Sequence, residues 1–350
     1  MGENEVVANI LNKQKDDIAR EVVEKIYSEQ SKLVKNYDEV KKEKSIRDVR
    51  YHLMFLSDAI LVNSTLLFEK YISWARDIME NIGISAPTFS NQLTIINNVI
   101  YKYLNQDHHP VVKKYIDVAI EELSKSKPKE ASFITKSNKY NELANEYLNL
   151  ILNSKRGEAL KLIMKAAEDV PIKDIYLSVF QPVQREIGRL WQKNKISVAQ
   201  EHYSTAVTQF IMANLYPYIF NADNKENKFA GLSVSSELHE VGIRMVTDIF
   251  ELEGWDTYYL GANTPTDSII NMIKSNDIDV VGVSATMSYH VSKVRNLIAR
   301  IKQETDNKTR VIVGGYPFLQ DDQLSRTIGA DGFATDATKA VKVAEELVSG

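Results

Sequence analysis

The stretch FAGLSVSSELHEVG (residues 229–242) decides how the C-terminal part of the chain folds. It begins as a short apolar run rich in β-formers, continues as a polar loop and ends in a helical pattern. Similar runs follow at DTYYLGA (256–262), DVVGVSAT (279–286) and RVIVGGYPF (310–318). Helical stretches alternate with them at about 239–253, 265–276, 288–304 and 321–329. Strand and helix in alternation at this spacing predict a parallel sheet with right-handed crossovers.

A last strand near GFAT (332–335) and a terminal helix complete five β/α units. We therefore expect residues 223–350 to form a doubly wound, Rossmann-like α/β domain.

The rest of the chain is predicted to be helical. Residues 1–125 carry apolar side chains at helical spacing almost throughout and should form an all-helical domain. Residues 126–134 are charged, small and proline-containing, which is typical of a linker. Residues 135–222 have the length of four helices, punctuated by Pro171 and Pro182, and should form a four-helix bundle that caps the α/β domain.

Composition excludes several classes of protein. The 350 residues carry a formal net charge of −4, so no basic field would attract nucleic acid or an anionic membrane. No uncharged apolar run is long enough to span a bilayer, and the N-terminus is unlike a secretory signal. Cysteine is absent, which excludes thiolate sites and thioether-linked chromophores, and a cytoplasmic location is expected. Any metal ligand must come from the six histidines or from carboxylates.

Three loops follow predicted strands, where an open α/β sheet binds its ligand. The first reads Glu237-Leu238-His239-Glu240-Val241-Gly242, the second contains Ser284 and Thr286, and the third is Gly314-Gly315. The intervals are 41 residues between Gly242 and Ser284 and 27 residues between Thr286 and Gly314. A nucleotide site is disfavoured because no G-x-G-x-x-G or Walker motif appears.

These three motifs resemble those of the cobalamin-binding family, in this order and at closely similar separations, over roughly residues 228–350. The resemblance implies that His239 is the lower ligand to cobalt and that Glu237 holds its other ring nitrogen. Small residues at Ser284, Gly314 and Gly315 would let the backbone approach a bulky ligand. Two positions depart from the family pattern: Glu237 replaces the usual Asp, and Thr286 replaces Leu.

The predicted cap carries a second pattern, in which Trp191 is followed by nine residues and then by Glu201-His202. This spacing resembles the signature of light-sensing adenosylcobalamin proteins. By that resemblance Trp191 would pack against the upper adenosyl group, and Glu201 and His202 would hydrogen-bond its polar atoms. Gln192 departs from the family, whose histidine at this place can bind cobalt after photolysis.

The stretch YHLMFLSDAILVNSTLLFEKYISWARDIMENIGI (51–84) resembles globin-like N-terminal sensor domains, and its combination with a cobalamin module resembles the photocobilins, which also bind a bilin. Biliverdin would then be held non-covalently. The candidate contacts are His52, His108, His109, Phe55, Phe68, Tyr71 and Trp74.

The expected function is that of a photoreceptor rather than an enzyme: light cleaves the cobalt–carbon bond and changes the packing of the cap and the assembly of a homo-oligomer. The signal would leave through quaternary structure or through a separate effector protein. A methyl-carrying corrinoid protein of a methyltransferase system is the alternative, and a cobalamin-responsive regulator indifferent to light is a third hypothesis. A mutase is disfavoured because the chain is too short to contain a substrate-binding barrel.

Overall fold

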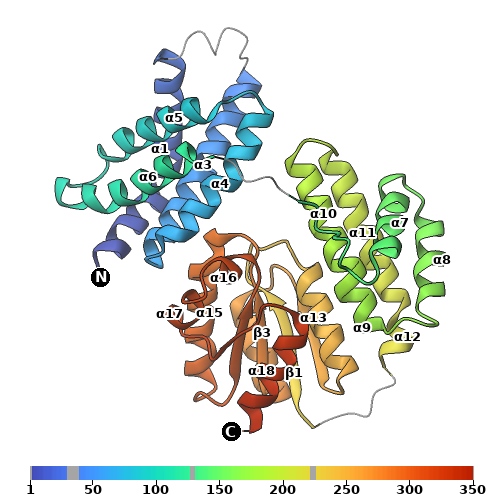
Figure 1. Cartoon of the computed structure of the whole chain (residues 1–350). Coiled ribbons are helices and arrows are strands. Elements are labelled where there is room, and N and C mark those ends of the chain that lie inside the picture. The colour runs from blue at the N-terminus through green and yellow to red at the C-terminus, as the bar shows by residue number, and fades with distance from the viewer. Residues whose placement is uncertain (1, 30–38, 127–130, 221–225, 350) are drawn as a thin grey trace. The chain divides into compact units, whose positions relative to one another are not determined.

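The computed structural model describes residues 2–29, 39–126, 131–220 and 226–349. The chain divides into two compact units (Figure 1). Unit 1 comprises residues 1–127, 285–296 and 316–329, and unit 2 comprises residues 128–284, 297–315 and 330–350. The predicted linker (126–134) and the boundary between residues 222 and 223 fall partly or wholly outside the described residues.

The N-terminal part of unit 1 is helical, as predicted, and each long helix buries one apolar face. Ser64 and Ser85 cap two of these helices, because their hydroxyls accept hydrogen bonds from the backbone N–H groups of Leu67 and Thr88. The helices are α1 (Glu3–Glu29), α3 (Glu39–Leu61), α4 (Thr65–Asn81), α5 (Ala86–Ile100) and α6 (His109–Ser124), with the short helix η1 (Gln106–His108) before α6. A globin-like arrangement of these helices stays a prediction.

Unit 1 also contains the helices that follow two of the strands, η3 (Ser288–His290) with the first turns of α15 (Val291–Glu304), and α16 (Tyr316–Gln320) with α17 (Leu324–Thr327). Phe55 of α3 meets the Tyr289 ring edge-on, with 4.9 Å between centroids. The buried carboxylate of Asp58 accepts a hydrogen bond of 3.2 Å from the backbone N–H of Ser292, in the first turn of α15. Helix α3 therefore caps a helix of the α/β region from more than two hundred residues away.

The helical cap of unit 2 has the predicted four helices and a short fifth one. They are α7 (Asn141–Leu152), α8 (Arg156–Ala166), the continuous segment α9–η2–α10 (Ile172–Gln192), α11 (Val198–Asn214) and α12 (Tyr216–Ile219).

The prediction that Pro182 punctuates the cap was wrong, because the helix runs through it. Residues Ile175–Phe180 (η2) are wound as a π-helix just before the proline. Pro182 has no N–H to donate to the carbonyl of Ser178, four residues earlier. The side chain of Asn138 donates to that carbonyl instead, at 2.6 Å. A side chain 40 residues away thus satisfies the carbonyl and lets the helix continue.

The sheet of unit 2 has five strands, all parallel, in the order β2-β1-β3-β4-β5. This confirms the predicted doubly wound α/β fold, in which the order of strand addition reverses between β1 and β3 while the strands stay parallel. The strands are β1 (Lys228–Ser233), β2 (Asp256–Gly261), β3 (Val280–Ser284), β4 (Arg310–Gly314) and β5 (Gly332–Phe333). The helices α13 (Val241–Leu252), α14 (Thr266–Asn276), the later part of α15, and α18 (Ala337–Ser349) complete the layers. The single helix predicted at 321–329 was wrong, since this connection forms the two short helices α16 and α17.

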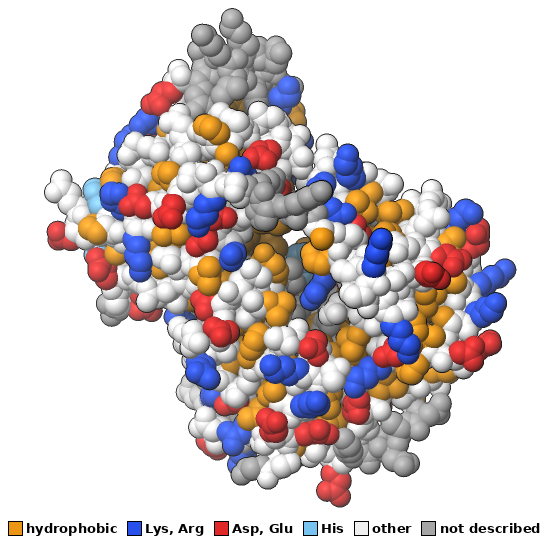
Figure 2. Space-filling model, in the orientation of Figure 1, with side chains coloured by type: hydrophobic (Ala, Val, Ile, Leu, Met, Phe, Trp, Pro, Cys, Tyr) orange, Lys and Arg blue, Asp and Glu red, His pale blue; other side chains and the backbone are white. Residues whose placement is uncertain are grey.

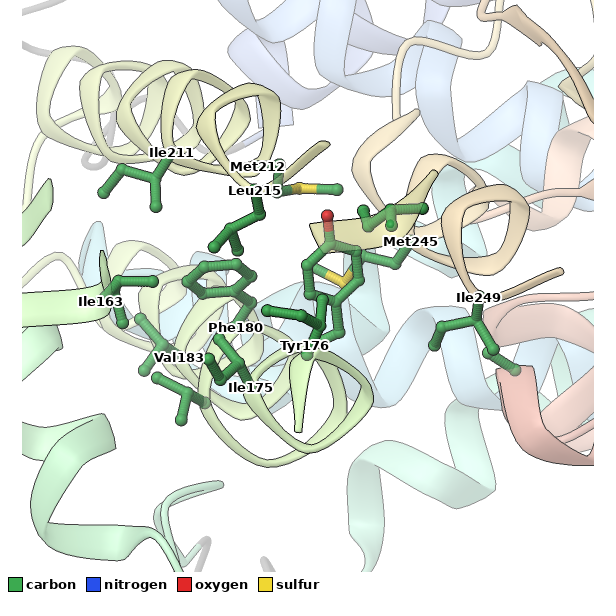
Figure 3. Close-up of a cluster of buried hydrophobic side chains, with 14 of the residues drawn as sticks. Ile163, Ile175, Tyr176, Phe180, Val183, Ile211, Met212, Leu215, Met245 and Ile249 are labelled. Carbon is green, nitrogen blue, oxygen red and sulfur yellow. The ribbon is translucent and has the colours of Figure 1, made fainter. Parts of the chain in front are cut away.

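The cap and the sheet share one hydrophobic core. Figure 3 shows Tyr176 and Phe180 of η2 beside Met212 and Leu215, with Met245 and Ile249 of α13 on the other side. The Tyr176 hydroxyl donates to the buried Asp248 carboxylate at 2.9 Å, which satisfies both groups inside this core. The cap is therefore packed directly on α13, the helix that follows the His239 loop.

The surface has no extended field of one charge on the face drawn in Figure 2, where acidic and basic side chains are interspersed. This agrees with the net charge of −4. Among the described helices, none is both long enough and apolar enough to cross a membrane.

Candidate functional site

The sheet brings the three sequence motifs together. Ser233, the last residue of β1, pairs in register with Ser284 at the end of β3, and Ser284 pairs with Gly314 at the end of β4. The loops that contain His239, Thr286 and Gly315 leave from these three neighbouring strand ends. A ligand above this edge would therefore meet all three motifs at once.

The loop after β1 presents the His239 imidazole on a fixed support. Its Nδ1 lies 2.5 Å from Oε1 of Glu237, and the same oxygen accepts the backbone N–H of His239 at 3.1 Å. Glu237 is 1% exposed, whereas the His239 side chain is 57% exposed. The hydrogen bond that His239 donates to Glu237 raises the pKa of His239, against the opposing effect of burial. The extra methylene of Glu237 thus does not prevent the carboxylate–imidazole contact.

The other residues predicted to line the site lie in the segments that follow β1, β3 and β4. Gly315 has a φ of +101°, in the left-handed region that favours glycine. Gly242, in the first turn of α13, has no atom within 4 Å of where a Cβ would lie. The Leu238 side chain, beside His239, is 75% exposed. Thr286 follows β3 by two residues and belongs to unit 1.

Helix α11 brings part of the predicted upper face towards this loop. A capping box between Ser197 and Gln200 starts the helix, so Glu201 and His202 lie in its first turn. The Glu201 charge contributes to raising the pKa of His239, after the larger effect of Glu237, so these side chains are electrostatic neighbours. His202 binds Glu201 at 2.6 Å and its side chain is 76% exposed.

Trp191 is only partly exposed, because it packs against the hydrophobic core of the cap. It lies in the last turn of α10, next to Gln192.

Sequence reasoning missed the contact between the cap and the His239 loop. Gln209 of α11 donates to Oε1 of Glu240 at 2.9 Å, and the backbone N–H of Ala262 donates to Oε2 at 3.2 Å. Gln209 lies seven residues after His202, on the same face of α11. That spacing was the available signal, but nothing in the sequence indicated that Glu240 was the partner.

In unit 1 the structure brings four of the candidate bilin contacts together. His52 and Phe68 are buried beside Tyr71, the Tyr71 hydroxyl lies 2.6 Å from Nδ1 of His52, and Phe55 stacks on Tyr71 with 3.6 Å between centroids. Burial lowers the pKa of His52 to about 4, so the imidazole is neutral at physiological pH. Trp74 lies at the edge of this group, 6.1 Å from Tyr71 between ring centroids.

The other two candidate histidines do not join this group. His108 lies 3.5 Å from Glu3, and His109 stacks on Tyr101 with 3.9 Å between ring centroids. His109 also contacts the carbonyl oxygens of Tyr101 and Leu104, which is a structural role at the start of α6.

The donor set suits a metal that the protein binds through a single side chain. Within the described ranges, no cluster of three or more histidine, aspartate or glutamate side chains could hold a metal ion. His239 instead offers Nε2, which has no hydrogen-bond partner among the described residues, while Nδ1 is fixed by Glu237. A single imidazole held in this way could bind a metal that is already coordinated by its own macrocycle. The residues therefore fit a cobalt corrinoid.

Comparison with known families agrees with this geometry. Residues 227–342 match the family model "B12 binding domain", and residues 143–216 match a second model of the same description. Residues 4–123 match the model "Phycobilisome protein". Two cobalamin-binding models therefore match the cap and the sheet region, and a model of a different family matches the N-terminal helices.

The relatives are corrinoid proteins. Dimethylamine corrinoid protein 3 of Methanosarcina acetivorans is 26% identical over 212 residues, which are 59% of this chain and 97% of the relative. A corrinoid protein of Desulfitobacterium hafniense is 24% identical over the same share of each chain. The solved structure of the monomethylamine corrinoid protein of Methanosarcina barkeri matches with a TM-score of 0.53 at 23% identity, over 59% of this chain and 99% of that one, and so shares its fold.

These relatives change which of the expected functions is favoured. They are named as corrinoid proteins and not as enzymes, which agrees with the expectation that the chain is not itself an enzyme. They favour the methyl-carrier alternative over the photoreceptor.

Proposed function

We propose that this protein is a corrinoid carrier that holds cobalamin between the helical cap and the sheet, with His239 as the lower ligand to cobalt. The observation that supports this proposal most directly is the exposed imidazole, which a buried carboxylate fixes at the edge where the three strand-end motifs meet. In this proposal Leu238, Gly242, Ser284, Thr286, Gly314 and Gly315 line the lower side. Trp191, Glu201 and His202 face the upper side.

The residues on the lower and upper sides of the proposed site support a carrier role. Bound cobalamin would supply an exchangeable cobalt–carbon bond, and His239 would hold the cobalt. Glu237 would orient the imidazole and keep Nε2 directed at the metal. The exposed His202 marks a part of the cap that a separate protein can reach, as a methyltransferase partner requires. The corrinoid relatives support this reading.

The lower-ligand assignment is tested by reconstituting the full chain with cobalamin. His239→Ala should weaken binding and change the absorption spectrum to that of cobalamin without a histidine ligand. His108→Ala is the matched control, because it removes an imidazole from helical unit 1 and should leave both readouts unchanged. An unaltered spectrum and affinity in His239→Ala would remove the assignment.

A light-sensing role is the second candidate, and two observations favour it. The N-terminal helices match the Phycobilisome protein model, which supports a bilin such as biliverdin as a second chromophore in a globin-like domain around His52 and Tyr71. The cap also carries Trp191 with the Glu201–His202 pair, as expected of a protein that encloses adenosylcobalamin. In this role the output would be a change of assembly or of a partner protein.

One experiment separates the two candidates. The protein is loaded with adenosylcobalamin, and spectrum and size-exclusion volume are recorded in the dark and after green light, with and without biliverdin. A light-driven spectral change accompanied by a change of assembly would identify a photoreceptor. No change of assembly, together with equal binding of methyl- and adenosylcobalamin, would exclude the photoreceptor and leave the methyl carrier or a light-indifferent cobalamin sensor. Trp191→Ala should abolish any preference for the adenosyl form.

A further inference from the structure

Glu240, the residue after the proposed cobalt ligand, joins three elements of unit 2. Its own position is the N-cap of α13. One carboxylate oxygen accepts from Gln209 of α11 in the cap at 2.9 Å, and the other accepts from the backbone N–H of Ala262, just beyond β2, at 3.2 Å. The cap, the His239 loop and the end of β2 therefore meet at one side chain.

Two residues of β2, Gly261 and Tyr259, lie beside the Glu240 carboxylate. Gly261 has a φ of +70°, in the left-handed region that favours glycine, and a Cβ on it would be in van der Waals contact with Oε2 of Glu240 at 3.4 Å. Burial and the Glu240 charge together raise the pKa of the Tyr259 phenol, which places the carboxylate beside that ring.

Other contacts hold the cap on α13 without touching the His239 loop. Tyr176 binds Asp248 in the middle of α13, and Lys173 pairs with Glu253 at 2.6 Å beyond its C-terminal end. The hydrogen bond between Gln209 and Glu240 is thus, among the described side-chain contacts, the one that ties cap helix α11 to a residue adjacent to His239.

We propose that Glu240 is a positioning residue that transmits the position of cap helix α11 to His239. With the hydrogen bond from Gln209 in place, the loop holds the imidazole at the metal. When α11 moves away, the loop loses that restraint and His239 dissociates more readily. The inference rests on the proposed cobalamin site and adds a coupling between its upper and lower sides.

The test exchanges the two partners in the full-length protein. Glu240→Ala removes the acceptor, and Gln209→Glu sets two carboxylates against each other. The double variant Gln209→Glu with Glu240→Gln restores both bonds, since an amide at position 240 can donate to the new carboxylate and still accept from Ala262. Lys173→Gln is the matched control, because it breaks a contact between the cap and α13 away from the loop.

Two readouts are used: hydrogen exchange of residues 201–209 and 234–240 in cofactor-free protein, and the ratio of histidine-bound to histidine-free cobalamin from absorption spectra. Both single variants should lower the ratio by about tenfold or more, the range of a hydrogen bond to a charged group, and speed exchange in both segments. The double variant should recover both, and Lys173→Gln should change neither.

The outcomes separate this inference from the proposed function. If wild-type protein binds cobalamin through His239 but the single variants match wild type, or the double variant gives no recovery, the coupling is overturned and the site remains. If the wild-type spectrum shows no histidine ligation, the proposed site itself is wrong. Exchange in cofactor-free protein then still reports whether Gln209 and Glu240 restrain each other.

Discussion

At the scale of single residues, the proposed cobalt site depends on one carboxylate and one imidazole. Glu237 is almost fully buried, and a buried carboxylate needs hydrogen bonds to compensate for lost hydration. It obtains them from the backbone N–H and the imidazole of His239. The ring is therefore oriented before any metal binds, which lowers the entropy lost on ligation.

Glu237→Gln tests this orientation. The amide keeps the shape but loses the charge that favours a proton on Nδ1, so Nε2 becomes a weaker ligand. We expect cobalamin affinity to fall by about 10- to 100-fold, with the fold unchanged by circular dichroism. Glu226→Gln, a carboxylate before β1, is the control. Equal affinity of Glu237→Gln and wild type would show that the carboxylate does not tune the ligand.

At the scale of elements, the cap is held to α13 by a buried polar pair. Asp248 accepts a hydrogen bond from Tyr176 of the π-helical segment. Arg244 and Tyr216 also act to lower its pKa, whereas the like charge of Glu251 acts to raise it. Burial is the largest cause that raises the pKa of Asp248, to about 6. The native state therefore binds a proton that the unfolded state releases at lower pH.

The contribution of Asp248 to the free energy of unfolding therefore decreases as pH rises from about 4 to about 6. In this range the native state binds more protons at Asp248 than the unfolded state does. Asp248→Asn keeps an acceptor for Tyr176 but cannot ionise, so it should remove this part of the pH dependence. We expect its free energy of unfolding, relative to wild type, to increase by on the order of 2 kcal/mol across this window. Urea unfolding at a series of pH values measures it, and parallel curves for variant and wild type would contradict it.

At the scale of the whole molecule, the chain combines a region that is similar to corrinoid proteins with a further helical region at its N-terminal side. The corrinoid relatives match 59% of the chain over nearly their whole length, while a different family matches residues 4–123. Within unit 1, however, the N-terminal helices hold η3 and α15 through the Phe55–Tyr289 and Asp58–Ser292 contacts. The added region is thus part of the support for the helix that follows β3.

Removal of residues 1–130 tests this support. We expect residues 131–350 to bind cobalamin, since His239 and its supporting residues remain, but to melt several degrees lower. The lost helix cap and aromatic contact are each worth about 1 kcal/mol, which shifts the melting temperature by about 2–4 °C apiece in a domain of this size. Asp58→Ala in the full chain isolates the cap. An unchanged melting temperature in both proteins would show that α3 gives α15 no support.

The sequence by itself determined the order of strands and helices and the residues at the strand ends. Apolar periodicity is a local property, and parallel strands necessarily gather their carboxyl ends, so the motifs around His239, Ser284 and Gly314 could be placed together without coordinates. Only the tertiary structure decided that Glu240 meets Gln209, that Asn138 replaces the missing donor of Pro182, and that Asp58 caps α15. The contacting residues, Gln209 and Glu240, Asn138 and Ser178, and Asp58 and Ser292, are 31, 40 and 234 residues apart. Such contacts depend on how packed elements orient their side chains, which no local pattern records.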